Sequence, residues 1–173
     1  MKIKSWQIIT VIICIILGIL LHFTYEWSGE NMLVGLFSAV NESTWEHLKL
    51  IYYPTVLIGI IGYFIIEKKT NNYWFALAVG IITAIAFTII FFYTYTGVIG
   101  TNFAWLNITT FIVAIILGGV VTYNILISRK NYNAEIISII FLILLFLSFV
   151  LYTFNPPSIA FFQDPITACI MLD

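Results

Sequence analysis

The sequence predicts an all-α, polytopic membrane protein built as a bundle of five transmembrane helices. Of its 173 residues, 62% are hydrophobic and only 9% are charged, and the mean hydropathy is +1.07. A soluble domain of this size carries far more charge. The few charges also fall between long apolar runs, so we expect one transmembrane helical domain over residues 1–173.

The first two spans are marked by runs without charge. The first run lies between Lys4 and Glu26 and predicts a helix over about 5–25. The second run lies between Lys49 and Glu67. With its start placed near Ser43, it predicts a helix over about 43–66. Each run holds the roughly 20 apolar residues that cross a bilayer core.

The next run, between Lys69 and Arg129, is too long for one crossing. A straight helix over it would be roughly three times as long as the hydrocarbon core is thick. The stretch TYTGVIGTN at 94–102 carries turn residues. It predicts two helices, over about 73–96 and 103–127.

A fifth span is expected over about 134–154, because Asn-Pro-Pro follows at once and ends the helix. In the tail, 155–173, Asp164 before Pro165 is typical of a helix N-terminus. The remaining residues are too few to span, so we expect a short C-terminal helix at the surface or tucked against the bundle.

Basic residues predict the orientation. With five crossings, six of the seven fall on one side, which should be the cytoplasm: Lys2, Lys4, Lys68, Lys69, Arg129 and Lys130. The N-terminus is therefore expected inside and the C-terminus outside. The link between the first two spans contains MLVGLFSAV, which is apolar but too short to cross. It predicts a re-entrant or interfacial segment.

Half of the eight acidic residues and both histidines lie in or beside this link. The re-entrant segment would bring His22 and Glu26, one helical turn apart, opposite Glu42, Glu46 and His47. Ionisable groups inside a span are costly and usually functional. Two imidazoles with carboxylates can hold zinc or another divalent metal, form a proton relay, or bind a polar ligand.

The predicted metal ligands are His22, Glu26, Glu46 and His47. The wider predicted ligand-binding set is His22, Glu26, Glu42, Glu46, His47, Lys49, Tyr93, Asn102 and Asp164.

A purely structural interpretation competes with this hypothesis. Ser43 to Glu46 matches a capping box, in which the Ser43 hydroxyl bonds the Glu46 backbone and Glu46 bonds back. Glu42 would be favoured by the helix dipole. Lys49, three residues after Glu46, is expected to extend its ammonium outward. Such effects explain His22 and Lys49 less well, because ionisable groups within a span are costly.

Other function classes find little support. The basic residues are too scattered for a nucleic-acid surface, so no nucleic-acid partner is expected. Cys14 and Cys169 show no metal or redox spacing, and we find no phosphate-binding loop or nucleophile elbow. The expected partner is the lipid bilayer, while protein partners and oligomeric state stay open.

Two motifs point to a family. HFTYEWSG at 22–29 and VNESTWEHLK at 40–49, with YTYTGVIGTN and PPSIAFFQDP further on, resemble an uncharacterised family of small bacterial integral membrane proteins, a domain of unknown function. The resemblance covers nearly the whole chain. It implies a multi-pass protein of the bacterial cytoplasmic (inner) membrane and no particular activity.

The expected function is to bind, sense or transport a small polar solute or cation at an extracytoplasmic His/Glu site. The first alternative is a metal-dependent intramembrane hydrolase that uses the same residues. The second is a structural or partner-binding membrane protein in which the cluster only caps helices. Whether the chain is an enzyme therefore stays open.

Overall fold

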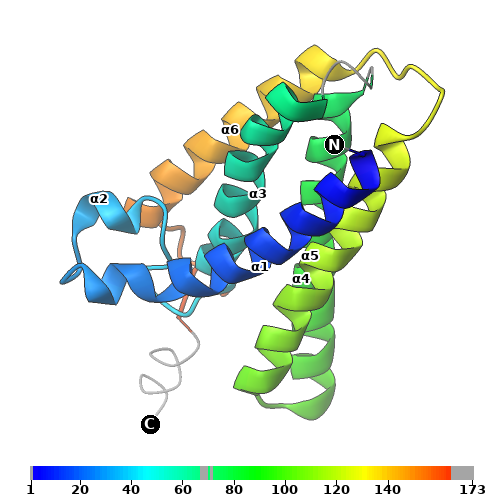
Figure 1. Cartoon of the computed structure of the whole chain (residues 1–173). Helices are drawn as coiled ribbons and strands as arrows, with labels where there is room; N and C mark the ends of the chain where they lie inside the picture. The colour runs from blue at the N-terminus through cyan, green and yellow to red at the C-terminus, as the bar shows by residue number, and fades with distance from the viewer. Residues whose placement is uncertain (1, 67–69, 71, 165–173) are drawn as a thin grey trace, which may run out of the picture.

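The computed structural model describes residues 2–66, 70 and 72–164, and these form helices and connecting loops with no strand (Figure 1). The helices are α1 (Ile3–Trp27), α2 (Met32–Gly35), α3 (Thr44–Ile66), α4 (Tyr73–Ile99), α5 (Ala104–Leu126) and α6 (Glu135–Phe154). All except α2 are long and apolar enough to cross a membrane. The predicted all-α architecture with five spans is confirmed, and the bounds agree to within about one turn.

The turn between α4 and α5 forms where the glycines and Asn102 predicted it. Gly100 adopts a left-handed backbone conformation, with φ of 78°, which glycine reaches without steric cost. Its N–H donates to the carbonyl of Thr96 at 2.8 Å and ends α4. The two helices then run back along each other as a hairpin (Figure 1).

Small residues allow this hairpin to pack closely. A Cβ added at Gly80 would lie 2.8 Å from the carbonyl oxygen of Gly118 and 2.0 Å from Oγ1 of Thr122. Thr122 donates its hydroxyl proton to the carbonyl of Ala76 across the contact, at 3.2 Å. Backbones that approach this closely gain dispersion contacts, which are a main source of helix association in lipid.

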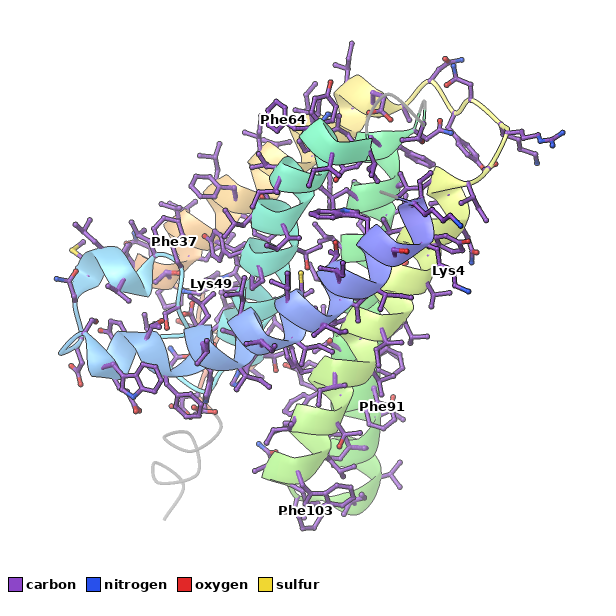
Figure 2. The ribbon with its side chains drawn as sticks, viewed as in Figure 1. Lys4, Phe37, Lys49, Phe64, Phe91 and Phe103 are labelled. Carbon is purple, nitrogen blue, oxygen red and sulfur yellow. The ribbon has the colours of Figure 1, made fainter. Side chains whose placement is uncertain are left out.

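Helix α3 is the centre of the bundle. Half of the residues in its most apolar 18-residue stretch are buried, which is the largest share among the five candidate spans. It contacts α1 on one side and α4 on another, while α1 also contacts α5. Large apolar side chains on the outside, such as Phe64 and Phe91, point away from the bundle (Figure 2). This is the pattern expected when lipid is the surrounding solvent.

Polar contacts join α4, α5 and α6 at the end of the bundle where α4 begins. Asn72 is buried, donates from Nδ2 to the Lys130 carbonyl at 2.6 Å, and accepts the N–H of Tyr132 at 3.0 Å. Glu135 accepts the N–H of Trp74 at 2.9 Å. These side chains satisfy backbone groups of the loops and of the first turn of α4.

The link between α1 and α3 folds back against the last turns of α1. Ser38 is fully buried, donates to the carbonyl of Leu21 at 2.5 Å, and accepts the N–H of Tyr25 at 3.1 Å. The short helix α2 at the tip exposes Met32 and Leu33. The link thus returns to the start of α3 and places its acidic residues beside α1.

The described part of the C-terminal tail also packs onto the start of α3. Phe161 and Phe162 contact Trp45, and the Phe161 carbonyl accepts the Trp45 N–H at 3.1 Å. The short helix predicted after Asp164 falls on 165–173, which lie outside the described residues.

Candidate functional site

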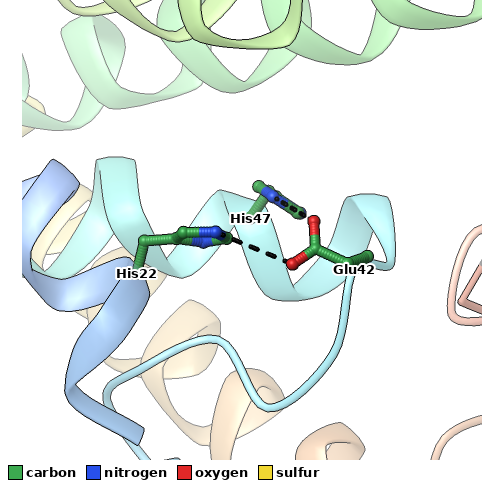
Figure 3. A group of neighbouring side chains, drawn as sticks. All are labelled: His22, Glu42 and His47. Carbon is green, nitrogen blue, oxygen red and sulfur yellow. Dashed lines mark ion pairs between the residues drawn. The ribbon is translucent and has the colours of Figure 1, made fainter. Parts of the chain in front are cut away.

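Three of the predicted site residues meet at one point between α1 and α3. His22 comes from the last turns of α1, His47 from the first turn of α3, and Glu42 from the loop just before α3 (Figure 3). The Glu42 carboxylate lies between the rings: Oε1 is 3.6 Å from His22 Nε2, and Oε2 is 3.4 Å from His47 Nε2. We call these residues the His/Glu cluster. It brings together side chains that are far apart in the sequence.

The orientation of His47 is fixed by its own helix. Its Nδ1 lies 2.9 Å from the carbonyl oxygen of Ser43, one turn earlier. A carbonyl oxygen only accepts, so Nδ1 must carry the proton in this bond. In the neutral ring, the lone pair then sits on Nε2, which is the atom that faces Glu42.

Two hydrogen-bond acceptors therefore face each other at His47 and Glu42. A neutral imidazole nitrogen and a carboxylate oxygen repel unless a proton or a metal cation lies between them. His22 contributes a third ligand atom from α1, and its Nδ1 is buried without a hydrogen-bond partner in the described part of the chain. A neutral His22 carries one N–H, which can serve Glu42 Oε1 from Nε2, so the unmatched pair of acceptors is His47 Nε2 and Glu42 Oε2.

Three ligand atoms lie near enough to one another to share a metal ion. One ligand atom from each of the three residues can be chosen so that all lie within 4.8 Å of one another. Ligands about 2.0–2.1 Å from a zinc ion stand about 3.3 Å apart in a tetrahedron, so the side chains would have to draw together slightly around the ion. The cluster is partly exposed, with 28% of each histidine side chain and 45% of Glu42 accessible. An ion can therefore reach it from outside.

Glu46 and Lys49 form a separate, buried ion pair. Glu46 Oε2 is 2.5 Å from Lys49 Nζ, and only 3% of the Glu46 side chain and none of the Lys49 side chain is exposed. Lys49 also donates to the Gly35 carbonyl at 2.8 Å and to Thr153 Oγ1 at 3.0 Å. The expectation that Lys49 extends outward was wrong, because its ammonium is buried and bonded to these partners inside the protein. Figure 2 labels Lys49 beside α3.

The predicted capping box is half formed. The Ser43 hydroxyl accepts the Glu46 N–H at 3.3 Å, as expected. The Ser43 N–H, however, donates to Asn41 Oδ1 at 2.9 Å, while Glu46 accepts the N–H of Val40 at 2.9 Å. Glu46 thus holds the preceding loop, and Glu42 is left to face the imidazoles.

The remaining predicted site residues lie in different places. Glu26 is exposed on α1 and is not in the group that could share an ion within the described chain. Tyr93 approaches the start of α3, where Thr44 donates to its hydroxyl at 3.4 Å. Asn102 lines the pocket described below, and Asp164 is half-buried in the tail. A ligand-binding role for these residues stays a prediction.

A pocket of about 310 Å³ adjoins the His/Glu cluster. It lies between α1, α3, α4 and α5, and the three cluster residues form part of its wall. Its volume is at the lower end of the range typical of small-molecule sites. Residues of α4 and α5 in the wall, such as Phe92 and Phe111, were not predicted, because apolar side chains in an apolar sequence carry no distinguishing signal.

One comparison with known proteins gave a match. The model of a family described as a family of unknown function (DUF6512) matches residues 1–170. No curated protein and no solved structure matched.

Proposed function

We propose that this chain, which belongs to the family of unknown function DUF6512, binds a divalent transition metal ion in the membrane through His22, Glu42 and His47. Zinc fits the ligand set best, because imidazole nitrogen and carboxylate oxygen are among its usual ligands. This is the cation-binding form of the function that the sequence led us to expect.

One observation carries the proposal. The hydrogen bond from His47 Nδ1 to the Ser43 carbonyl directs the Nε2 lone pair at a carboxylate oxygen 3.4 Å away. A histidine that ligates a metal typically donates its other ring N–H to a carbonyl or carboxylate in this way. In the proposed site, the Ser43 carbonyl would hold the His47 ring in the orientation that a metal ligand needs.

The test is the metal content of the purified protein. The protein, without an affinity tag that binds metals, is stripped with chelator in a neutral detergent, incubated with zinc and desalted. We expect about one zinc ion per chain in the wild type. His47→Ala and Glu42→Gln should each lower the affinity by at least about tenfold, because loss of one of three ligands removes several kcal/mol of binding energy.

Glu30→Gln is the matched control, since Glu30 is an exposed carboxylate of the same link, outside both the His/Glu cluster and the predicted ligand set. It should keep the wild-type zinc content. A wild type that holds no zinc, or a His22→Ala, His47→Ala double variant that holds as much as the wild type, would exclude the proposed site.

A second candidate, a metal-dependent hydrolase, is favoured by the number of ligands. Three protein ligands leave the fourth tetrahedral position open, and catalytic zinc sites have this form. The exposure of the cluster to the pocket is consistent with it. Lys49 does not support this role, because its ammonium is held by Glu46 and Gly35. Zinc-dependent hydrolysis of a chromogenic ester, lost in His47→Ala, is the measurement that would favour it.

The proposed orientation places the His/Glu cluster on the extracytoplasmic side of the bacterial inner membrane. It is supported by the positive-inside rule and by the position of the cluster at the end of α1 opposite Lys4. The ion would then be taken from the periplasmic or external side.

A further inference from the structure

The pocket beside the His/Glu cluster is lined mostly by apolar atoms, and His22, Glu42 and His47 supply its ionisable groups. Ile19 and Phe111 are among the apolar residues of the wall, which we call the apolar body, while neutral polar side chains also line it: Thr44, Thr88, Asn102, Asn107 and Thr110. Such a lining selects ligands by matching one polar group and one apolar part.

We propose that this pocket binds a single-chain amphiphile with an anionic oxygen head, of which a medium-chain carboxylate is the simplest example. The head occupies the open coordination position of the metal ion, and the chain fills the apolar body. The inference rests on the proposed metal site and adds the class of ligand that this site takes.

Charge favours an anionic head. A divalent cation with one carboxylate ligand, Glu42, leaves an excess of about one positive charge at the His/Glu cluster. The first residues of α3 and α5, Thr44 and Ala104, also line the pocket. The first N–H groups of α3 are already bonded to Phe161 and Ser43. The positive end of α5 adjoins the pocket, and no side chain caps it.

The exposed residues of the pocket wall favour an apolar chain that enters from the lipid. Ile19, Phe23 and Ile108 line the pocket and are also among the large apolar side chains exposed on the outside, at 41%, 41% and 55%. The wall of the pocket is thus continuous with the surface that faces lipid. A volume of about 310 Å³ suits one short chain better than the two chains of a phospholipid.

Native mass spectrometry of the full chain, released from a neutral detergent, counts zinc and ligand separately. The probes are decanoate, acetate as the head without a chain, and decanol as the chain without an anionic head. We expect one decanoate on each zinc-bound chain, and at least about tenfold weaker retention of acetate and decanol, equivalent to 1.4 kcal/mol.

Ala104→Phe narrows the pocket from the exposed start of α5. It should weaken decanoate binding by at least about tenfold and leave zinc bound. Ile116→Phe is the matched control, because Ile116 is exposed on the same helix but is not in the pocket wall. It should bind decanoate like the wild type. If Ala104→Phe fails to fold, Ile19→Trp gives the same test, because it narrows the pocket from α1.

The outcomes separate the two proposals. Zinc without decanoate on the wild type overturns the amphiphile and leaves the metal site standing. Decanoate without zinc, or equal decanoate on chelated and zinc-loaded protein, overturns the placement of the head on the metal. Unchanged decanoate on both pocket variants overturns the location. A wild type with neither zinc nor decanoate overturns both proposals.

Discussion

His47 and Ser43 are joined through the first turn of α3: the ring Nδ1 of His47 lies 2.9 Å from the carbonyl oxygen of Ser43. This contact directs the other ring nitrogen away from its own helix and toward Glu42. In the proposed metal site, a backbone carbonyl would thus orient the His47 ring, and substitution of the Ser43 side chain would leave this carbonyl in place.

We predict that zinc binding weakens on acidification. Both imidazoles must be neutral to ligate, so protons compete with the metal at His22 and His47. Isothermal titration at about pH 7.5 and about pH 5.5 should give an affinity lower by at least about tenfold at the acidic value. An affinity that does not change over this interval would argue against imidazole ligands.

We predict that the buried ion pair of Glu46 and Lys49 is strongly coupled. Lys49→Met leaves the buried Glu46 carboxylate without its cation and should cost about 3–5 kcal/mol of unfolding free energy. The double variant with Glu46→Gln removes both charges and should be more stable than Lys49→Met alone. Equilibrium unfolding in mixed micelles with SDS, followed by circular dichroism, measures both.

Lys130→Met is the control for this pair, because it removes an exposed lysine. Lys130→Met should change the free energy of unfolding by no more than about 0.5 kcal/mol. Equal, small effects of Lys49→Met and Lys130→Met would show that Lys49 reaches water in the membrane-bound protein.

We predict that two glycines of the same helix respond in opposite ways to alanine. Gly80→Ala forces a methyl group against Gly118 and Thr122 and should destabilise the α4–α5 hairpin by about 1–3 kcal/mol. Gly97→Ala meets no atom within 4 Å and should be neutral or stabilising by up to about 1 kcal/mol. The same unfolding assay compares them, and equal effects would contradict the close packing of the hairpin.

We predict that the two ends of the bundle lie on opposite sides of the membrane. In a variant with Cys14 and Cys169 replaced, a single cysteine at Thr101, in the α4–α5 turn, should react with a membrane-impermeant thiol reagent added to whole cells. A single cysteine at Asn131, in the α5–α6 loop, should react only after the cells are opened. Labelling in the reverse order would invert the proposed orientation.

The five long apolar helices could be predicted because the length of chain without charge indicates most of them. The run between Lys69 and Arg129 could be divided correctly because glycines and Asn102 mark the turn. The extents of α4 and α5 were harder to predict, since helix ends depend on local caps such as Gly100 rather than on hydropathy.

The candidate site was only partly predictable. His22 and His47 sit on helices, and the folded-back link brings those helix ends together as expected. The predicted metal ligands include Glu46 and not Glu42, whereas Glu42 is the carboxylate that lies beside both imidazoles. Glu42 precedes α3, so helical periodicity does not set its direction. The i,i+3 spacing permits the ion pair of Glu46 and Lys49, but the burial of Lys49 against the Gly35 carbonyl depends on the folded-back link and is not encoded locally.

Because His22 and His47 belong to different helices, an ion held between them would also close a ring of chain that runs through the whole α1–α3 link. It would act as a removable cross-link, and closing such a ring restricts the freedom of the unfolded chain. Helix α1, which Ser38 already holds to the link at this end, would then also be fastened to the start of α3 while the metal is present. Metal supply in the envelope would thereby set how long the protein survives proteolysis, whatever chemistry the ion performs.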